Sequence, residues 1–293
     1  MIALAPALDA LLNQGRAPPT DAWPAGTRWV ETRAGRLRVL DTGGAGPVVL
    51  MTPDGPNVIE HHLEVIDRLR PHGRIVCFDL PGFGYSRPGP RYGHRLEEGA
   101  AVVLSLMDAL QIPEAALHFS CANGLYALAA AKAAPQRIRR LMLCQTPSLE
   151  AMRAWTHRTV PRPLQVPVAG QLLMRAARRR FAKIWYDIAL PDPTLRPGFL
   201  AKADQALCSG GCYCLAGVVQ GLLRARDGAL DGVRQPVTLL WGGRDRSHRH
   251  TRAESLQDLV PQAQVHQFPE SGHFPDLEHP QRYADLALAA LDA

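Results

Sequence analysis

Short apolar runs alternate with amphipathic helical patterns along most of the chain. The apolar runs indicate strands over residues 28–32, 36–41, 47–51, 74–78, 115–120, 138–144, 236–241 and 264–268. Apolar residues at helical spacing indicate helices over residues 59–70, 95–110, 122–134 and 277–291. Strands and helices that alternate in this way predict an α/β fold, in which a mainly parallel sheet has helices on both faces.

This alternation stops after Thr146-Pro147 and resumes at Pro236. Residues 147–232 have helical periodicity and no good strand. We therefore predict an α/β core formed by residues 1–146 and 233–293. An all-helical cap, or lid, formed by residues 147–232 is inserted into it.

Composition narrows the class of protein. The 293 residues are 46% hydrophobic and 20% charged, as in globular domains. The net charge of +6 comes from scattered arginines without interleaved aromatic residues, so we expect no nucleic-acid partner. No apolar run is long enough for a membrane span. The first twelve residues lack the charged start of a signal peptide and predict an amphipathic helix. Six scattered cysteines favour a reduced, cytoplasmic protein.

Three segments that follow expected strands carry the candidate chemistry. Cys121 lies where a strand gives way directly to a helix, at the carboxyl edge of the sheet and at a helix N-terminus that favours a thiolate. Asp245 follows an apolar strand and Gly-Gly, and His273 follows Gly272 after the last strand. Each residue alone has an ordinary structural explanation, but the order nucleophile, acid, histidine is typical of a catalytic triad.

These segments and three neighbouring motifs resemble the α/β-hydrolase fold family, in its capped branch of haloalkane dehalogenases, epoxide hydrolases, C–C hydrolases and esterases. Residues 79–86 match the family's D-x-P-G-x-G-x-S turn, and residues 135–138 match the segment before the strand that follows the nucleophile helix. Residues 237–245 and 271–280 match the acid and histidine segments. The resemblance covers residues 28–146 and 234–291. It implies a mostly parallel eight-stranded sheet and a cofactor-free enzyme without a catalytic metal.

The resemblance implies a role for each residue of the candidate triad. Cys121 takes the nucleophile position, His273 that of the base and Asp245 that of the third member. The nucleophile is not Asp, which argues against dehalogenase and epoxide-hydrolase chemistry. The expected reaction is hydrolysis of an ester, thioester or lactone through an acyl-cysteine.

Two departures from the family pattern leave alternatives open. Phe119 and Asn123 replace the usual small residues that flank the nucleophile, and Gly124 can relieve part of the crowding. We expect the Ala122 N–H to stabilise the oxyanion. The second donor depends on the register of the loop at Asp54-Gly55-Pro56: it is the Gly55 N–H in one register and the Asn57 side chain in the other, because proline has no N–H.

The cap and the remaining cysteines give weaker signals. We expect an apolar acyl or lactone substrate to contact Phe119, Asn123, Trp185 and Phe274.

Cys208, Cys212 and Cys214 could hold a soft metal, but their spacing argues against it and we expect none. The basic stretch between Arg175 and Lys183 favours a solvated helix face, with an acyl carrier protein as the alternative partner. His248 and His250 are expected in a solvated loop.

The same acyl-cysteine allows another reaction. A thioester is open to attack by amines, so the chain could be an acyltransferase or cyclase in a biosynthetic pathway. The departures at Phe119 and Pro56 also permit a non-catalytic small-molecule-binding protein with a hydrolase fold. The sequence does not indicate the oligomeric state.

Overall fold

The computed structural model describes residues 4–14 and 20–292 of the chain. Its main sheet has the strand order β1-β2-β4-β3-β7-β8-β10-β11, and β6 (Arg87–Pro88) pairs with β2 at one end. The strands of that path are β1 (Thr27–Thr32), β2 (Gly35–Asp41), β4 (Arg74–Phe78), β3 (Val48–Thr52), β7 (Ala115–Ser120), β8 (Ile138–Cys144), β10 (Val237–Gly242) and β11 (Gln264–Phe268). β1 and β2 pair antiparallel, as does β2 with β4, and the strands from β4 to β11 run parallel. The predicted fold class is confirmed.

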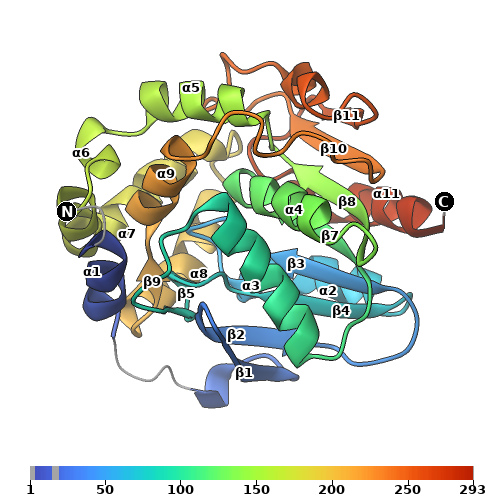
Figure 1. Ribbon diagram of the computed structural model, residues 1–293, viewed down its shortest axis with the longest axis horizontal. Coiled ribbons are helices and arrows are strands. Elements are labelled where there is room, and N and C mark those ends of the chain that lie inside the picture. Colours follow the sequence, from blue (N-terminus) through green and yellow to red (C-terminus); the bar gives the residue numbers. More distant parts are fainter. Residues whose placement is uncertain (1–3, 15–19, 293) are drawn as a thin grey trace.

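Helices cover both faces of this sheet because its central strands are buried on both sides (Figure 1). Alternate residues of β3 pack on opposite faces of the sheet. Leu50 packs in the core beneath α3 (Leu96–Ala109) and α4 (Ala122–Ala133). Val49 and Met51 pack in the core beneath α2 (Leu63–Leu69) and α11 (Pro280–Asp292). The short elements are η1 (Thr20–Ala22), η2 (Ile59–His61), η3 (Ala253–Asp258) and α10 (Pro275–Glu278).

The segment between β8 and β10 forms a helical layer at the carboxyl edge of the sheet (Figure 1). It contains α5 (Leu149–Thr159), α6 (Arg162–Gln165), α7 (Ala169–Ala189), α8 (Arg196–Cys208) and α9 (Leu215–Leu223). It also contains a two-residue strand, β9 (Cys212–Tyr213), which pairs antiparallel with β5 (Phe83–Gly84) of the core. The segment is therefore helical except for this one contact strand.

The N-terminal helix α1 (Leu4–Leu12) packs against α7 and α9 (Figure 1). It corresponds to the predicted amphipathic helix, whose first three residues lie outside the described residues. No helix in the described part of the chain is long and apolar enough to cross a membrane.

The turn at residues 79–86 is built around a buried carboxylate. Asp79 accepts hydrogen bonds from Arg38 Nε at 2.8 Å and from the Tyr85 backbone N–H at 3.0 Å. Gly84 has a φ of +48°, and a Cβ there would lie 2.2 Å from Asp79 Oδ2. The motif thus requires both residues, and it holds β5 where the helical layer pairs with it.

Candidate active site

Cys121 occupies a strained turn between β7 and α4. Its φ of 53° and ψ of −128° lie outside the regions that non-glycine residues normally adopt. Its backbone N–H donates to Cys144 O at 2.7 Å, and its carbonyl accepts from Thr146 Oγ1 at 3.0 Å. These bonds to β8 and the residue beyond it fix the turn and aim the side chain at the carboxyl edge of the sheet.

The residues flanking this turn explain how it tolerates a bulky neighbour. Phe119 points into the core, where its ring packs edge-on against Phe78 with centroids 5.9 Å apart. The Asn123 side chain donates to Pro53 O at 3.0 Å. Close packing is provided by Gly124, because a Cβ there would lie 2.1 Å from Thr146 Oγ1. Phe119 is therefore a core residue and does not line the cavity beside Cys121, contrary to its expected substrate contact.

His273 and Asp245 form a short, fully buried pair next to Cys121. His273 Nδ1 lies 2.6 Å from Asp245 Oδ2. Asp245 also accepts from Gln145 Nε2 and from the Ser247 backbone N–H, both at 2.8 Å. Burial alone would raise the pKa of Asp245, but the positive charge and hydrogen bond of His273 hold it below its ordinary value. Asp245 is thus an anion that orients the imidazole.

Asp54 lies on the other side of the imidazole, a position that the sequence did not assign a role. Its Oδ2 atom is 3.3 Å from His273 Nε2. One ligand atom each of Asp54, Cys121 and His273 lie within 4.8 Å of one another. The site is therefore a cluster of four titratable groups, in which His273 is placed between two carboxylates.

Burial and neighbouring charges set the proton positions in this cluster. Burial raises the pKa of Cys121 to about 11, the Asp54 charge adds to the rise, and His273 opposes it. Burial also raises the pKa of Asp54, against the influence of His273. Burial would lower the pKa of His273, but Asp245, Cys121 and Asp54 together raise it well above 6.5. The neighbouring carboxylates therefore favour the protonated imidazole, while burial favours the neutral thiol of Cys121.

His248 belongs to this site, and its expected place in a solvated loop is wrong. The residue is 2% exposed. Its ring stacks on Trp155 at 5.2 Å and on His273 at 5.5 Å between centroids. Burial lowers its pKa to about 3, so it is neutral beside the protonated His273. His250 is exposed, as predicted.

An apolar cavity of about 190 Å³ opens directly above Cys121. Asp54, Gly55, Cys121, Ala122 and Asn123 form its polar floor. Trp185 also lines it and contacts the His273 ring edge-on at 4.8 Å. The walls are side chains from α5, α6, α7 and α9, among them Met152, Leu164, Phe181, Ile188, Val219 and Leu222. Such a lining suits an apolar acyl group or ring.

The loop after β3 places one of its two expected oxyanion donors, Gly55, at the cavity and the other, Asn57, away from it. The Gly55-Pro56 peptide bond is cis. Gly55 and Ala122 line the cavity with Cys121, whereas neither Pro56 nor Asn57 is part of the lining. The Asn57 side chain instead accepts from Tyr186 Oη at 2.8 Å. Phe274, expected at the substrate, also lies outside the lining and packs against the His273 ring at 5.0 Å.

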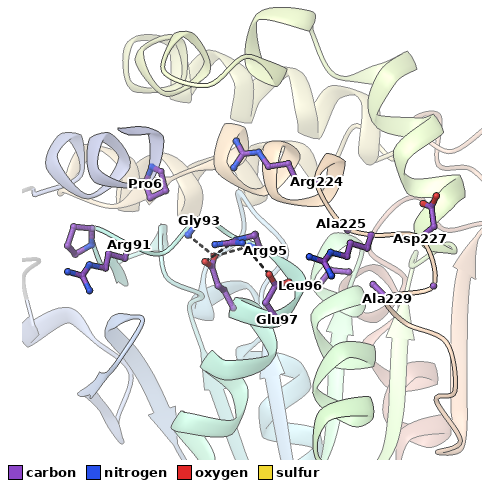
Figure 2. A pocket seen from close by; sticks show the side chains of 14 residues that line it. Pro6, Arg91, Gly93, Arg95, Leu96, Glu97, Arg224, Ala225, Asp227 and Ala229 are labelled. Atoms are coloured by element: carbon purple, nitrogen blue, oxygen red, sulfur yellow. Dashed lines mark hydrogen bonds and ion pairs between the residues drawn. The ribbon is translucent and has the colours of Figure 1, made fainter. Parts of the chain in front are cut away.

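A larger hollow of about 1010 Å³ lies on the surface near the start of α3 (Figure 2). Charges of both signs line it, including Arg95, Glu97, Arg224 and Asp227. It shares no lining residue with the cavity above Cys121. Of these two cavities, the smaller is the candidate site, because Cys121 lines it and lies beside His273.

The cap cysteines and the basic stretch have separate surroundings. Cys208 is exposed, whereas Cys212 and Cys214 are buried. Arg178 donates to the backbone carbonyls of Leu207 and Gly211, both at 2.8 Å. Arg179 pairs with Asp204, and Lys183 pairs with Asp187 at 2.9 Å. These charges are thus partly neutralised within the chain.

Comparison with known proteins defines the class. Residues 47–280 match the model of the alpha/beta hydrolase fold family. The chain is 26% identical over 269 residues to 2-hydroxymuconate semialdehyde hydrolase from Pseudomonas sp. strain CF600, covering 88% of this chain and 92% of that protein. It is 24% identical over 282 residues to haloalkane dehalogenase 2 from Mycobacterium tuberculosis, covering 91% and 95%.

Solved structures agree with this fold. An enol-lactonase from Burkholderia xenovorans LB400 superposes with a TM-score of 0.73 at 17% identity, covering 91% of this chain and 100% of that one. An esterase from Thermogutta terrifontis superposes with a TM-score of 0.71 at 24% identity, covering 92% and 98%. The chain belongs to the α/β hydrolase fold family, and its activity is that of a hydrolase of this type.

Proposed function

We propose that the protein hydrolyses an ester, thioester or lactone with an apolar acyl part, through an acyl intermediate on Cys121. The observation that carries this proposal is the strained Cys121 turn, which lies beside the His273–Asp245 pair at the floor of an apolar cavity. Haloalkane dehalogenase 2 is among the relatives, but the nucleophile position here holds sulfur and not a carboxylate. An acyl-cysteine therefore suits this chain better than an ester on Asp.

Asp54 supplies the acceptor that the thiol needs in this proposal. Because the two flanking carboxylates favour the protonated imidazole, His273 is a poor base for the resting thiol. Burial raises the pKa of Asp54, so its carboxylate can take the thiol proton and leave a thiolate beside the imidazolium. The thiolate then attacks the substrate carbonyl carbon, and the backbone N–H groups of Gly55 and Ala122 stabilise the oxyanion.

The remaining steps follow from the proton on His273. When the tetrahedral intermediate collapses, the carbon–oxygen or carbon–sulfur bond to the leaving group breaks, and His273 gives that group its Nε2 proton. His273 then accepts a proton from water as the water attacks the thioester. Collapse of the second intermediate breaks the carbon–sulfur bond and releases the acid, and Asp54 returns its proton to the sulfur.

One observation favours acyl transfer or ring closure as a second function. The walls of the cavity are apolar side chains, and Cys121 is only 4% exposed. A site that excludes water gives an amine or alcohol within the substrate an advantage over water in releasing the acyl group.

The test is product analysis on a panel of p-nitrophenyl esters, acyl thioesters and enol-lactones. We expect release of free acid at a rate that depends on Cys121 and is unchanged in Cys208→Ser, which alters an exposed thiol of the cap. Products joined to added amines or alcohols would indicate transfer. A chain that binds these compounds but forms neither acid nor adduct would support the non-catalytic binding protein and contradict the proposed function.

A further inference from the structure

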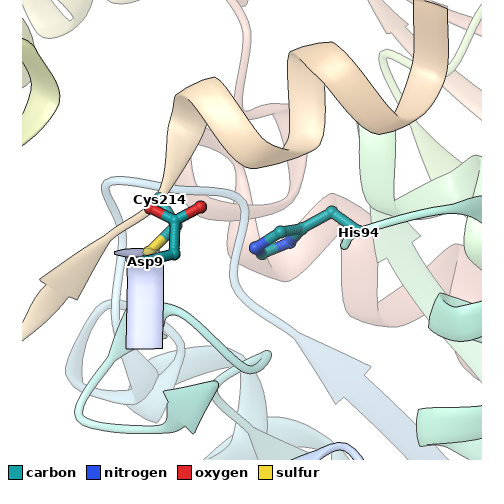
Figure 3. A group of neighbouring side chains, drawn as sticks. All are labelled: Asp9, His94 and Cys214. Carbon is teal, nitrogen blue, oxygen red and sulfur yellow. The ribbon is translucent and has the colours of Figure 1, made fainter. Parts of the chain in front are cut away.

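A second buried group of Asp, His and Cys side chains lies away from the Cys121 site (Figure 3). Asp9 comes from α1, His94 from the loop before α3, and Cys214 from the residue that precedes α9. One ligand atom from each lies within 4.8 Å of the other two. The three residues are 3%, 1% and 1% exposed. Segments that are far apart in the sequence thus bring three possible metal ligands together in the interior.

The His94 ring packs against the rings of Tyr92 and Phe83, at 4.6 and 6.1 Å between centroids, and points toward the other two side chains (Figure 3). Its Nε2 atom is buried and makes no hydrogen bond with any residue in the described part of the chain. A φ of 56° and a hydrogen bond from Tyr126 Oη to its carbonyl at 2.9 Å fix its backbone. A buried nitrogen of this kind is costly unless something binds it.

Gly217 lies directly over this nitrogen. A Cβ at position 217 would be 2.9 Å from His94 Nε2 and 3.0 Å from Asp9 Oδ2. The nearest ring atom, His94 Cδ2, would be only 2.5 Å away, so only glycine fits against this side of the cluster. A side chain at this position would collide with the His94 ring.

Neighbouring amides are arranged around the two acidic groups. Asn13 Nδ2 donates to Cys214 Sγ at 3.3 Å, and Gln171 Nε2 donates to Asp9 Oδ2 at 3.2 Å. Both donors suit a thiolate and a carboxylate, and such outer contacts commonly orient metal ligands. Asp9 and Cys214 also hydrogen-bond each other, and the Arg178 charge acts on Cys214. A bound dication would displace the thiol proton and balance the charges of the thiolate and the carboxylate.

We propose that Asp9, His94 and Cys214 bind a divalent transition-metal ion, with Zn²⁺ as the best match to one nitrogen, one sulfur and one oxygen ligand. A water molecule would complete the tetrahedral shell. The ion joins α1, the α/β core and the cap, so its role is structural. The side chains of Asp9 and Cys214 are both buried. A cation relieves the cost of burying the charged forms. This site is independent of the proposed hydrolase reaction.

Metal binding by the full chain tests the proposal directly. Chelator-treated protein is titrated with ZnCl₂ by calorimetry, and CoCl₂ is added to Cys121→Ser to remove the active-site thiol as a competing ligand. We expect one Zn²⁺ per chain, a cobalt–thiolate absorption band, and a higher Tm with the metal than after chelation. In Cys214→Ser and His94→Gln we expect the Kd for Zn²⁺ to rise at least about 100-fold.

The controls separate this site from the other thiols. Cys208→Ser and Cys121→Ser should bind Zn²⁺ like the unaltered chain. Equal Zn²⁺ affinity in Cys214→Ser, or loss of binding only in Cys121→Ser, would overturn the proposal. Should the cluster variants not fold, the cobalt spectrum of Cys121→Ser decides alone, and a spectrum without a thiolate band rejects the site.

Discussion

The molecule buries two groups of cysteine, histidine and aspartate whose surroundings are opposite. At Cys121 both nitrogens of His273 face carboxylates, and an apolar cavity opens beside the sulfur. At Cys214 the His94 Nε2 atom has no hydrogen-bond partner among the described residues, and none of the three side chains lines the cavity above Cys121. The same residue types are thus prepared for proton transfer in one place and for holding a cation in the other.

The groups that surround His273 and His94 account for most of the difference between the two clusters. Carboxylates raise the pKa of His273 despite complete burial, whereas burial alone lowers the pKa of His94 to about 3. The backbone adds a second difference, because the strained Cys121 turn presents its side chain at the carboxyl edge of the sheet. Chemistry therefore follows from the environment and not from the set of residue types.

The largest expected effect comes from removing the active-site sulfur. Cys121→Ala should lower kcat/KM for a p-nitrophenyl ester by at least about 10³-fold, because no other group can form the acyl intermediate. Steady-state kinetics measure the loss, with Cys208→Ala as the matched control. Turnover above one tenth of the starting rate in Cys121→Ala would contradict the role of Cys121 as nucleophile. The two clusters would then not differ in the reactivity of their cysteines.

Asp245→Asn should lower kcat by about 10²- to 10⁴-fold. An amide keeps the shape but cannot accept from His273 Nδ1 as a carboxylate does, so the imidazole loses its orientation and its charge partner. The same kinetics, with circular dichroism to verify folding, measure the effect. A variant that retains full kcat would show that the short contact to His273 is only structural.

Asp54→Asn tests whether Asp54 accepts the thiol proton. Ester turnover should fall by about 10- to 100-fold, because the thiol proton loses its acceptor. Steady-state kinetics measure the loss, and Asp192→Asn, at an exposed position, is the control. Turnover at the starting rate in Asp54→Asn would contradict the role of Asp54.

The smallest expected effect comes from replacing His118, a buried histidine, and it concerns the pH dependence of stability. Burial lowers the pKa of His118 to about 3 in the folded chain, whereas the unfolded chain takes up its proton near pH 6.5. Stability is therefore lost as pH falls from 6.5 toward 3. His118→Gln should lessen the loss in unfolding free energy between pH 7 and 5 by about 2 kcal/mol. Urea unfolding at both pH values measures it, with His250→Gln, at an exposed position, expected to show no change.

Local patterns predicted the fold and the three candidate triad segments well. Apolar runs located the strands, and the order of Cys121, Asp245 and His273 predicted that they meet at one edge of the sheet, as they do. Their chemical roles remain predictions. The residues that these patterns missed are positioned by long-range packing. Asp54 lies in a loop that the sequence left in two registers, and the stacking of His248 depends on Trp155 of α5.

The cluster around His94 was missed for a related reason. Its ligands come from a short N-terminal helix, a loop and the start of α9, which share no motif or spacing. The sequence drew attention to Cys214 only through its neighbours Cys208 and Cys212, which do not join it in the fold. A site assembled from three unrelated segments becomes visible only when α1 and α9 have packed against the loop before α3.

Peptide mapping of the acyl adduct tests the central claim most directly. The chain is mixed briefly with a slowly hydrolysed ester or acyl thioester, quenched in acid, digested and analysed by mass spectrometry. The account predicts one acyl group, attached to Cys121 and absent from Cys121→Ala. An adduct on Ser120 or another residue, or turnover that proceeds with no adduct under any quench time, would contradict it.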